Sequence, residues 1–323
     1  MGKGFRVLGA CQVFGGKAGD KRGQATAKAT TTADPYGMTN ERTDNSNNNG
    51  NGDGDGNPHG WCSNLRGMKI AVVTGAAQGI GRKTAEVLAG AGYGLLLMDV
   101  QSCGATMAAV RAAGVEAEEV LGDVSDEAVV ERAVEMVLSR WGRVDVLVNN
   151  AGISFIAAAE TVEGKAFMRV LEVNLLAPFL LAKGFGAMML EQKSGSIVNV
   201  ASVAGLVGIG DRSAYNASKH GLIGLTRTLA AEWGGRGVRC NAVCPGWVKT
   251  EMDVADQAGG GYEDADIEGV NPMGRFAAPE DVARAILFLA EPEWSGFING
   301  QALPVDGGWT TDGSWQSLRM RMR

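Results

Sequence analysis

One short segment limits most strongly how this chain can fold: an apolar strand that runs directly into a glycine-rich turn and a helix. The strand is Lys69-Ile-Ala-Val-Val-Thr-Gly75, and Gly79 and Gly81 follow in the turn. A strand that is apolar on both faces belongs inside a parallel sheet covered by helices on both sides. The three glycines allow the next helix to begin without side chains over its amide end. The segment therefore predicts the first strand-turn-helix unit of an α/β fold.

The alternation of short apolar runs with longer helical patterns continues from Lys69 to about residue 310. Such alternation is typical of a parallel sheet with helices on both faces. We therefore predict one α/β domain over residues 67–310, with a doubly wound parallel sheet. The expected strands are Ile70–Thr74, Gly94–Asp99, Glu116–Gly122, Val144–Asn149, Ser196–Val200, Val238–Val243 and Ala302–Val305. The expected helices are Gly81–Gly90, Glu127–Trp141, Ala177–Gln192, Ala214–Trp233 and Pro279–Leu289.

The two ends of the chain depart from this pattern. Residues 1–66 have no sustained apolar period and contain the polar run Asn45-Ser-Asn-Asn-Asn-Gly-Asn-Gly-Asp-Gly-Asp-Gly-Asn57. Such a segment buries too little apolar surface to offset chain entropy, so we predict a disordered tail, and a loose C-terminal tail over residues 311–323. The first part of residues 1–66 is basic, as in organellar transit peptides. A cytoplasmic location and a plastid or mitochondrial one both stay open.

Composition excludes several classes of function. The formal net charge of -6 gives no general attraction to nucleic acid or to anionic lipid. The longest unbroken apolar runs fall far short of the roughly 20 residues that cross a bilayer, so no membrane span is expected. The five cysteines are odd in number and lack the paired spacing of a zinc site, so we expect free thiols and no metal. A protein that acts on a small molecule fits best.

The glycine turn and the strand that follows it are suited to a dinucleotide. Free N–H groups and the positive dipole end at the start of a helix attract a pyrophosphate. Asp99 closes the next apolar strand eighteen residues after Gly81, where a carboxylate accepts hydrogen bonds from ribose hydroxyls and repels a 2'-phosphate. No basic residue follows Asp99, and Gln78 in the turn is neutral. These residues favour NAD over NADP, although a glycine turn can also serve close packing alone.

A second feature is the pair formed by Tyr215 and Lys219. Their spacing of four residues places both side chains on one face of the expected helix. A free phenol has a pKa of about 10, and a nearby ammonium group favours the phenolate. Proton transfer by Tyr215 could then proceed near neutral pH. Such pairs are common on exposed helices, so this one indicates nicotinamide redox chemistry only in combination with the glycine turn.

Taken together, these motifs resemble the short-chain dehydrogenase/reductase family, and the resemblance covers about residues 67–310. It implies a Rossmann-type fold, and the matching segments occur in the family's order and spacing. They are Thr74-Gly-Ala-Ala-Gln-Gly-Ile-Gly81, Asp123-Val124, Asn149-Asn-Ala-Gly152, Asn174, Ser202, Tyr215 with Lys219, Pro245-Gly246 with Thr250, and Val305-Asp-Gly-Gly308.

The resemblance implies a role for each matched residue. Tyr215 would be the general acid/base, and Lys219 would lower its pKa and bind the nicotinamide ribose. Ser202 would position and polarise the substrate oxygen, while Asn174 would hold a water in a proton relay that ends at Lys219. The implied cofactor-binding residues, with those of the turn, are Gly75, Gln78, Gly79, Ile80, Gly81, Asp99, Asp123, Val124, Asn150, Ala151, Gly152, Tyr215, Lys219, Pro245, Gly246, Val248 and Thr250.

The function implied by the resemblance is hydride transfer between NAD(H) and a secondary alcohol or ketone. A polyol, sugar or similar hydroxylated substrate is expected, because residues 229–239 are similar to those of NAD-linked polyol and sugar dehydrogenases. The alternative is an NADPH-dependent 3-oxoacyl-[acyl-carrier-protein] reductase, which typically carries basic residues where this chain has Gly186 and Ala231. A non-catalytic dinucleotide-binding sensor or scaffold is a third possibility.

Two further expectations come from the resemblance. The family usually forms homotetramers, with the helices of residues 177–192 and 214–233 at one interface. It also places a mobile substrate lid between Thr250 and Gly274, and seven acidic side chains of this chain fall there. They could repel anions, although acidic side chains also occur on faces that are simply solvated.

Overall fold

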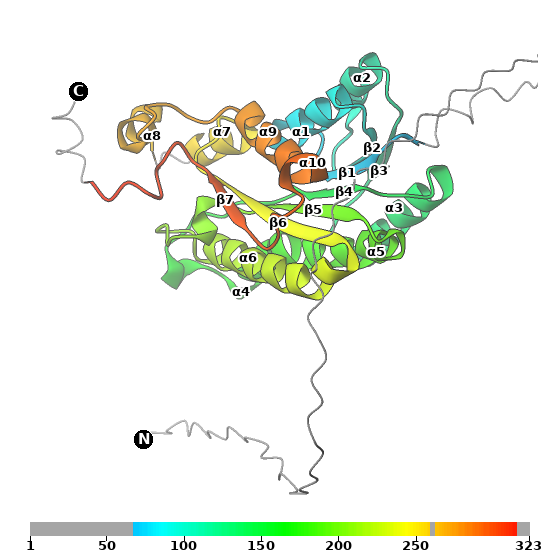
Figure 1. The fold of residues 1–323 in the computed structure, drawn as a ribbon. Helices are drawn as coiled ribbons and strands as arrows, with labels where there is room; N and C mark the ends of the chain where they lie inside the picture. Colours follow the sequence, from blue (N-terminus) through cyan, green and yellow to red (C-terminus); the bar gives the residue numbers. More distant parts are fainter. Residues whose placement is uncertain (1–66, 259–261, 315–323) are drawn as a thin grey trace, which may run out of the picture. The chain divides into compact units, whose positions relative to one another are not determined.

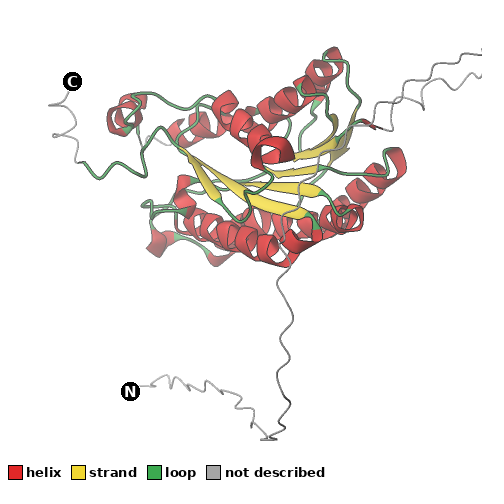
Figure 2. Cartoon of the chain, in the orientation of Figure 1, coloured by secondary structure: helices red, strands yellow, loops and turns green. Residues whose placement is uncertain are grey.

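The computed structural model describes residues 67–258 and 262–314 of the chain. These residues form a parallel sheet in the order β3-β2-β1-β4-β5-β6-β7 (Figures 1 and 2). The predicted doubly wound parallel sheet is therefore confirmed. The strands are β1 (Ile70–Thr74), β2 (Gly94–Asp99), β3 (Ala117–Leu121), β4 (Val146–Asn149), β5 (Gly195–Val200), β6 (Val238–Pro245) and β7 (Ala302–Val305). The tail predicted for residues 1–66 lies outside the described residues, as do residues 315–323 of the other tail.

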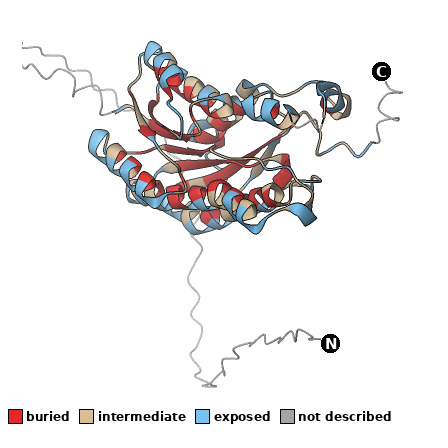
Figure 3. Cartoon of the chain, turned by 180° about the vertical axis from the view of Figure 1, so that it is seen from behind, coloured by how far each residue is buried: buried red, intermediate tan, exposed pale blue. Residues whose placement is uncertain are grey.

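Alternate side chains of the central strand β1 point into two separate apolar cores. Ile70 and Val72 pack into one core, and Ala71 and Val73 pack into the other. Buried residues therefore fill the space on both faces of the sheet (Figure 3), which explains why β1 is apolar throughout. The first core is closed by α3 (Glu127–Arg140), α5 (Ala177–Gln192) and α6 (Ser213–Trp233), and the second by α1 (Gly79–Gly90), α2 (Gly104–Ala112) and α9 (Pro279–Ala290) (Figure 1).

The predicted strands and helices end within two residues of the observed ones, but several helices were missed. Most of these are short, and α4 runs through a π-helical turn, Glu172–Leu176, into α5. A π turn inserts one residue and shifts the apolar period, so the pattern is readable only from Ala177 onward. The missed helices are α2, α4 (Gly164–Leu171), α7 (Glu251–Ala258), α8 (Asp264–Val270) and α10 (Pro292–Ser295).

The continuous helical run of residues 164–192 bears on the expectation that the chain contains no membrane span. In the described part of the chain it is the one helix that is long and apolar enough, by length and composition, to cross a membrane. However, 56% of its apolar 18-residue window is buried inside the domain. Leu181, Phe185 and Met189 of α5 lie in the core against the sheet. Packing on the sheet therefore accounts for its apolar composition.

Candidate active site

A cavity of about 470 Å³ opens at the carboxyl ends of the strands. The strand order reverses at β1, which lies between β2 and β4, and a parallel sheet leaves a crevice at such a reversal. The described residues that line the cavity come from the segments that follow β1 to β6. They include every site residue predicted from the sequence except Gly81 and Asn174.

The turn after β1 is shaped as an open cradle. Gly75 and Gly79 have φ angles of +64° and +56°, which side chains rarely allow. Gln78 is the N-cap of α1, and its side chain makes no capping hydrogen bond, so the amide end of the helix stays open. Gly81 serves packing instead, because a Cβ atom there would lie 1.9 Å from the carbonyl oxygen of Gly75. The cradle fits the pyrophosphate of a dinucleotide.

Asn150 and Thr74 hold this cradle against the end of β4. The Asn150 side chain donates to the carbonyl oxygens of Thr74 and Gly75 at 2.9 and 3.1 Å. The Thr74 hydroxyl accepts the N–H groups of Asn150 and Ala151, both at 3.0 Å. Asn150, Ala151 and Gly152 thereby line the cavity, and their contact with the cofactor stays a prediction. We did not predict from the sequence that Thr74 connects the turn to the segment after β4. The available signal was a hydroxyl group at the last position of the strand.

Asp99 is fixed at the end of β2 by two backbone groups. One carboxylate oxygen accepts the N–H of Ala77 in the glycine turn, and the other accepts the N–H of Gln101, both at 2.9 Å. The carboxylate thus lies beside the cradle, on the cavity wall. Among the described residues that line the cavity, Arg169 and Arg212 are each paired with an aspartate. Neither is a free partner for a 2'-phosphate.

Asp123 and Val124, at the end of β3, occupy the adjoining wall. Asp123 accepts hydrogen bonds from the backbone and hydroxyl of Ser125 and forms an ion pair with Arg169 of α4. Burial acts to raise the pKa of Asp123, but the hydrogen bonds from Ser125 and Arg169 outweigh it and lower the pKa below its ordinary value. The contact with Arg169 joins two distant segments, and no sequence spacing indicated it.

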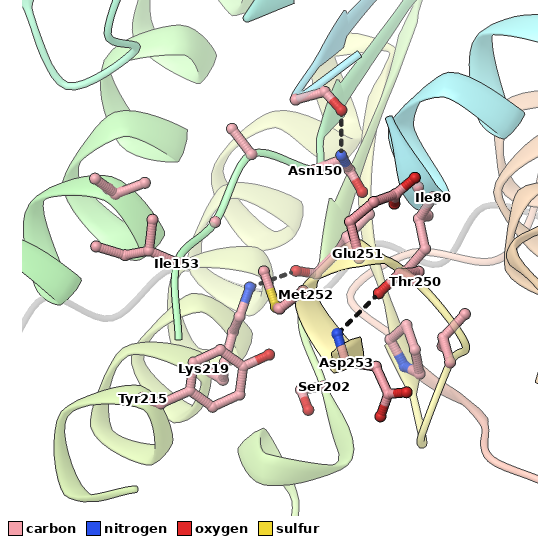
Figure 4. A pocket seen from close by; sticks show the side chains of 18 of the residues that line it. Ile80, Asn150, Ile153, Ser202, Tyr215, Lys219, Thr250, Glu251, Met252 and Asp253 are labelled. Atoms are coloured by element: carbon pink, nitrogen blue, oxygen red, sulfur yellow. Dashed lines mark hydrogen bonds between the residues drawn. The ribbon is translucent and has the colours of Figure 1, made fainter. Parts of the chain in front are cut away.

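Tyr215, Lys219 and Ser202 lie close together on the wall of the cavity (Figure 4). Tyr215 and Lys219 lie one turn apart on α6, with the ammonium nitrogen 5.6 Å from the centre of the phenol ring. Ser202 follows β5, and its hydroxyl accepts the N–H of Ala204 at 3.1 Å. Lys219 is only 4% exposed and donates to the carbonyl oxygen of Val200 at 2.8 Å. The predicted side-by-side arrangement of these groups is present.

The ionisation of the pair differs from the expectation based on spacing. Burial raises the pKa of Tyr215, and although a hydrogen bond with Ser202 and the charge of Arg212 act to lower it, burial prevails. Burial also lowers the pKa of Lys219 to about 8. The sequence predicted that Lys219 would lower the pKa of Tyr215, but the dominant influence on both groups is the loss of solvent.

Asn174 lies behind the cavity wall, fully buried in the π turn. Its side chain pairs with both backbone groups of Ile153, at 2.9 and 3.0 Å, and donates to the hydroxyl of Ser218 at 3.1 Å. A Cβ atom built on Gly152 would lie 3.3 Å from the side-chain oxygen of Asn174 and 3.6 Å from the nitrogen of Lys219. Asn174 therefore holds the loop that separates it from Lys219. The water relay remains a prediction.

Another wall of the cavity is formed by the end of β6 and the residues that follow it. Pro245, Gly246, Val248 and Thr250 line the cavity, and their contact with the cofactor stays a prediction. A Cβ atom on Gly246 would lie 3.0 Å from the Cα atom of Asp306, so the chain passes close to the segment after β7. The Thr250 hydroxyl, just before α7, accepts the N–H of Asp253 at 3.4 Å.

A group of polar side chains also lines the cavity: Arg212, Asp253, Asp256 and Tyr262. We call this part of the cavity its outer end, and the sequence did not indicate the contacts made there. Arg212 donates to the Asp256 carboxylate at 3.0 Å and to the Ser154 hydroxyl at 2.9 Å. Tyr262 donates to Asp253 at 2.9 Å. The available signal was the position of Arg212, which is the residue immediately before α6 and three residues before Tyr215.

The chain belongs to the short-chain dehydrogenase/reductase family. A family model described as Enoyl-(Acyl carrier protein) reductase matches residues 75–310. The D-threitol dehydrogenase of Mycolicibacterium smegmatis is 40% identical over 244 residues, which cover 75% of this chain and 93% of that protein. The 3-oxoacyl-[acyl-carrier-protein] reductase of Synechocystis sp. is 38% identical over 246 residues, 74% of this chain and 96% of that protein.

A solved structure has the same fold. It is described as a candidate NAD(P)-dependent gluconate 5-dehydrogenase from Beutenbergia cavernae with bound NADP at low occupancy. It is 41% identical, with a TM-score of 0.71, over 76% of this chain and 97% of that one. The protein is thus an NAD(P)-dependent oxidoreductase that acts on CH–OH groups. The prediction of an enzyme is confirmed, and the alternative of a non-catalytic sensor or scaffold is set aside.

Proposed function

We propose that this enzyme transfers hydride between NAD(H) and a secondary alcohol or ketone of the polyol and sugar class. One observation carries the proposal: Ser202, Tyr215 and Lys219 meet in the same cavity as the glycine cradle and Asp99. The cradle would hold the pyrophosphate, and Asp99 the adenosine ribose. Asp123 and Val124 would contact the adenine, and Thr250 would face the nicotinamide side.

The chain's own residues would supply the proton chemistry. Bound NAD(H) supplies or accepts the hydride at the carbon atom. In reduction, Tyr215 donates its proton to the oxygen that becomes the alcohol, and its raised pKa keeps that proton available at neutral pH. Ser202 hydrogen-bonds the same oxygen as charge develops on it. Oxidation runs the same proton transfer in reverse, with Tyr215 as the base.

NAD is proposed over NADP because of the carboxylate of Asp99. Its two oxygens are held by the N–H groups of Ala77 and Gln101, so it cannot easily turn away from a 2'-phosphate. Repulsion in a partly buried site weakens the binding of NADP. The Beutenbergia relative contains NADP, so the preference has to be measured on this chain itself.

The polyol and sugar class is supported by the D-threitol dehydrogenase relative and by the polar outer end of the cavity. The Synechocystis relative favours a second candidate, an NADPH-dependent 3-oxoacyl-[acyl-carrier-protein] reductase. Against it, Gly186 is buried on Trp233, and Ala231 is small and uncharged, so neither offers a cation to an acidic carrier protein.

The test follows nicotinamide absorbance with the purified full-length chain. NAD and NADP are compared on polyols and simple secondary alcohols, and NADH and NADPH on acetoacetyl thioesters. We expect the wild type to oxidise a polyol with NAD. Tyr215→Phe should reduce this activity at least about a thousandfold while still binding NAD in a fluorescence titration. NADPH-specific thioester reduction would favour the second candidate. Tyr215→Phe with nearly full activity would disprove the assigned acid/base.

We further propose a homotetramer, in keeping with the family expectation. Met168, Leu176 and Phe179 are exposed apolar residues on the helical run of α4 and α5, where one interface is expected. Light scattering of the purified protein measures the mass of the oligomer and so tests this proposal.

The compartment needs a separate test. A fluorescent fusion of residues 1–66 distinguishes a cytoplasmic from an organellar location.

A further inference from the structure

The outer end of the cavity contains an ion pair that the proposed hydride and proton chemistry does not use. Arg212 lies immediately before α6, one turn ahead of Tyr215, and its Nη1 atom contacts Asp256 of α7 and the hydroxyl of Ser154. The side chains of Arg212 and Asp256 are only 14% and 17% exposed. Three segments that are distant in sequence therefore meet here, and Arg212 and Asp256 line the same cavity as Tyr215.

We propose that Arg212 and Asp256 determine substrate specificity by binding neighbouring hydroxyl groups of a neutral polyol or sugar and by rejecting carboxylates. This inference rests on the proposed function and narrows its substrate class. A hydroxyl group both donates and accepts, whereas a guanidinium only donates and a carboxylate only accepts. One hydroxyl of a vicinal diol can donate to Asp256 while the next accepts from Arg212. The ion pair thus matches a diol better than it matches any single charged group.

The charges at this end of the cavity disfavour an anionic substrate. Asp256 already balances the charge of Arg212, and Asp253, 6% exposed, adds a second carboxylate to the same wall, paired with Lys249 at 3.1 Å. A substrate carboxylate would have to face Asp256 or displace it from Arg212. Like charges brought together in a poorly solvated site oppose binding strongly.

An apolar acyl chain fits this wall no better. It would cover Arg212 and Asp256 without offering a hydrogen bond to either, and burying charged groups without polar partners is unfavourable. A neutral hydroxylated substrate is the class that both replaces water at the ion pair and adds no charge.

The experiment compares matched pairs of a polyol and its polyhydroxy acid as substrates of the full-length enzyme with NAD. Threitol with threonate and sorbitol with gluconate differ mainly in one carboxylate. The measured quantity is the ratio of kcat/KM for the polyol to kcat/KM for the acid. In the wild type we expect a ratio of at least about 10, and Asp256→Asn should lower it on the order of tenfold, because Arg212 then carries an unbalanced charge.

Glu268→Gln is the matched control, since it removes one negative charge from exposed α8 at a residue outside the cavity lining. Its ratio should equal that of the wild type. A second measurement needs no variant: threonate should inhibit threitol oxidation by the wild type only at concentrations at least about tenfold above the KM for threitol. This keeps the inference testable if Asp256→Asn does not fold.

The outcomes separate the inference from the proposed function. If the enzyme oxidises polyols, and if Asp256→Asn lowers the ratio while Glu268→Gln leaves it unchanged, both the inference and the proposed function are supported. Two results would overturn the inference and leave the proposed function standing. One is polyol oxidation with the same ratio in Asp256→Asn as in the wild type. The other is inhibition by threonate at concentrations close to the KM for threitol. NADPH-dependent thioester reduction with no turnover of any polyol would overturn both.

Discussion

Replacing Lys219 with methionine should make the protein more stable while abolishing its activity. Lys219 is 4% exposed, and burial lowers its pKa from the ordinary 10.5 to about 8. Each unit of pKa corresponds to about 1.4 kcal/mol, so keeping the buried side chain protonated costs about 3 kcal/mol. Methionine has a similar length and no charge. It loses the hydrogen bond to Val200, about 1 kcal/mol, so the free energy of unfolding should rise by about 2 kcal/mol at pH 7.

The pH dependence of this gain identifies its cause. Below pH 8, Lys219 is protonated in both the folded and the unfolded protein, and the full cost is present. Between pH 8 and 10.5 the folded protein releases this proton while the unfolded protein keeps it, so the stability of the wild type rises with pH. Other titrating groups are common to both proteins and cancel. Because Lys219 is already half deprotonated at pH 8 in the folded protein, the advantage of Lys219→Met should shrink by about 1 kcal/mol from pH 8 to pH 9.

Urea denaturation of both proteins at pH 7, 8 and 9, followed by tryptophan fluorescence, measures these differences. Lys183→Met is the control, because Lys183 is exposed on α5, and its effect should be small and independent of pH. If Lys219→Met were less stable than the wild type at pH 7, or if its advantage did not change with pH, the reasoning about burial would be refuted.

Two further variants test the nucleotide-binding region. Gly81→Ala would place a Cβ atom 1.9 Å from the carbonyl oxygen of Gly75 and should lower stability by about 3 kcal/mol or more, whereas Gly90→Ala meets no atom within 4 Å and should melt at or above the wild-type temperature. Equal melting temperatures would refute the close approach. Asp99→Asn keeps one of the two accepting oxygens and removes the charge, so the ratio of kcat/KM for NADP to that for NAD should rise about tenfold or more. An unchanged ratio would mean that Asp99 does not select the cofactor.

Much of the fold could be predicted because its signals are local. The apolar strand before Gly75 and the glycines after it specify a strand, a turn and a helix within a few residues. α5 was predicted at its observed bounds, Ala177–Gln192, since its apolar pattern is regular. The π turn around Asn174 was missed because its extra residue breaks the period on which such predictions depend.

The parts of the site that could not be predicted are those that depend on the fold as a whole. Arg212 lies 44 residues from Asp256 and 58 from Ser154, and nothing in either spacing indicates a contact. The ionisation of Tyr215 is similar, because spacing places Lys219 beside it but does not reveal how much water the surrounding strands exclude. Exclusion of water proves to be the larger effect.

Burial of Tyr215 and Lys219 has opposite effects on the two pKa values, and this bears on catalysis. Free tyrosine and lysine side chains have similar pKa values, whereas here the pKa of the phenol is raised and that of the ammonium group is lowered to about 8. Lys219 is therefore the stronger acid of the two, and this order favours proton transfer from Lys219 to a Tyr215 phenolate. A phenolate formed when Tyr215 gives up its proton can therefore be reprotonated readily from the lysine side. The energy lost by burying Lys219 is then inseparable from its use in the reaction, since an exposed lysine would be stable but too weak an acid.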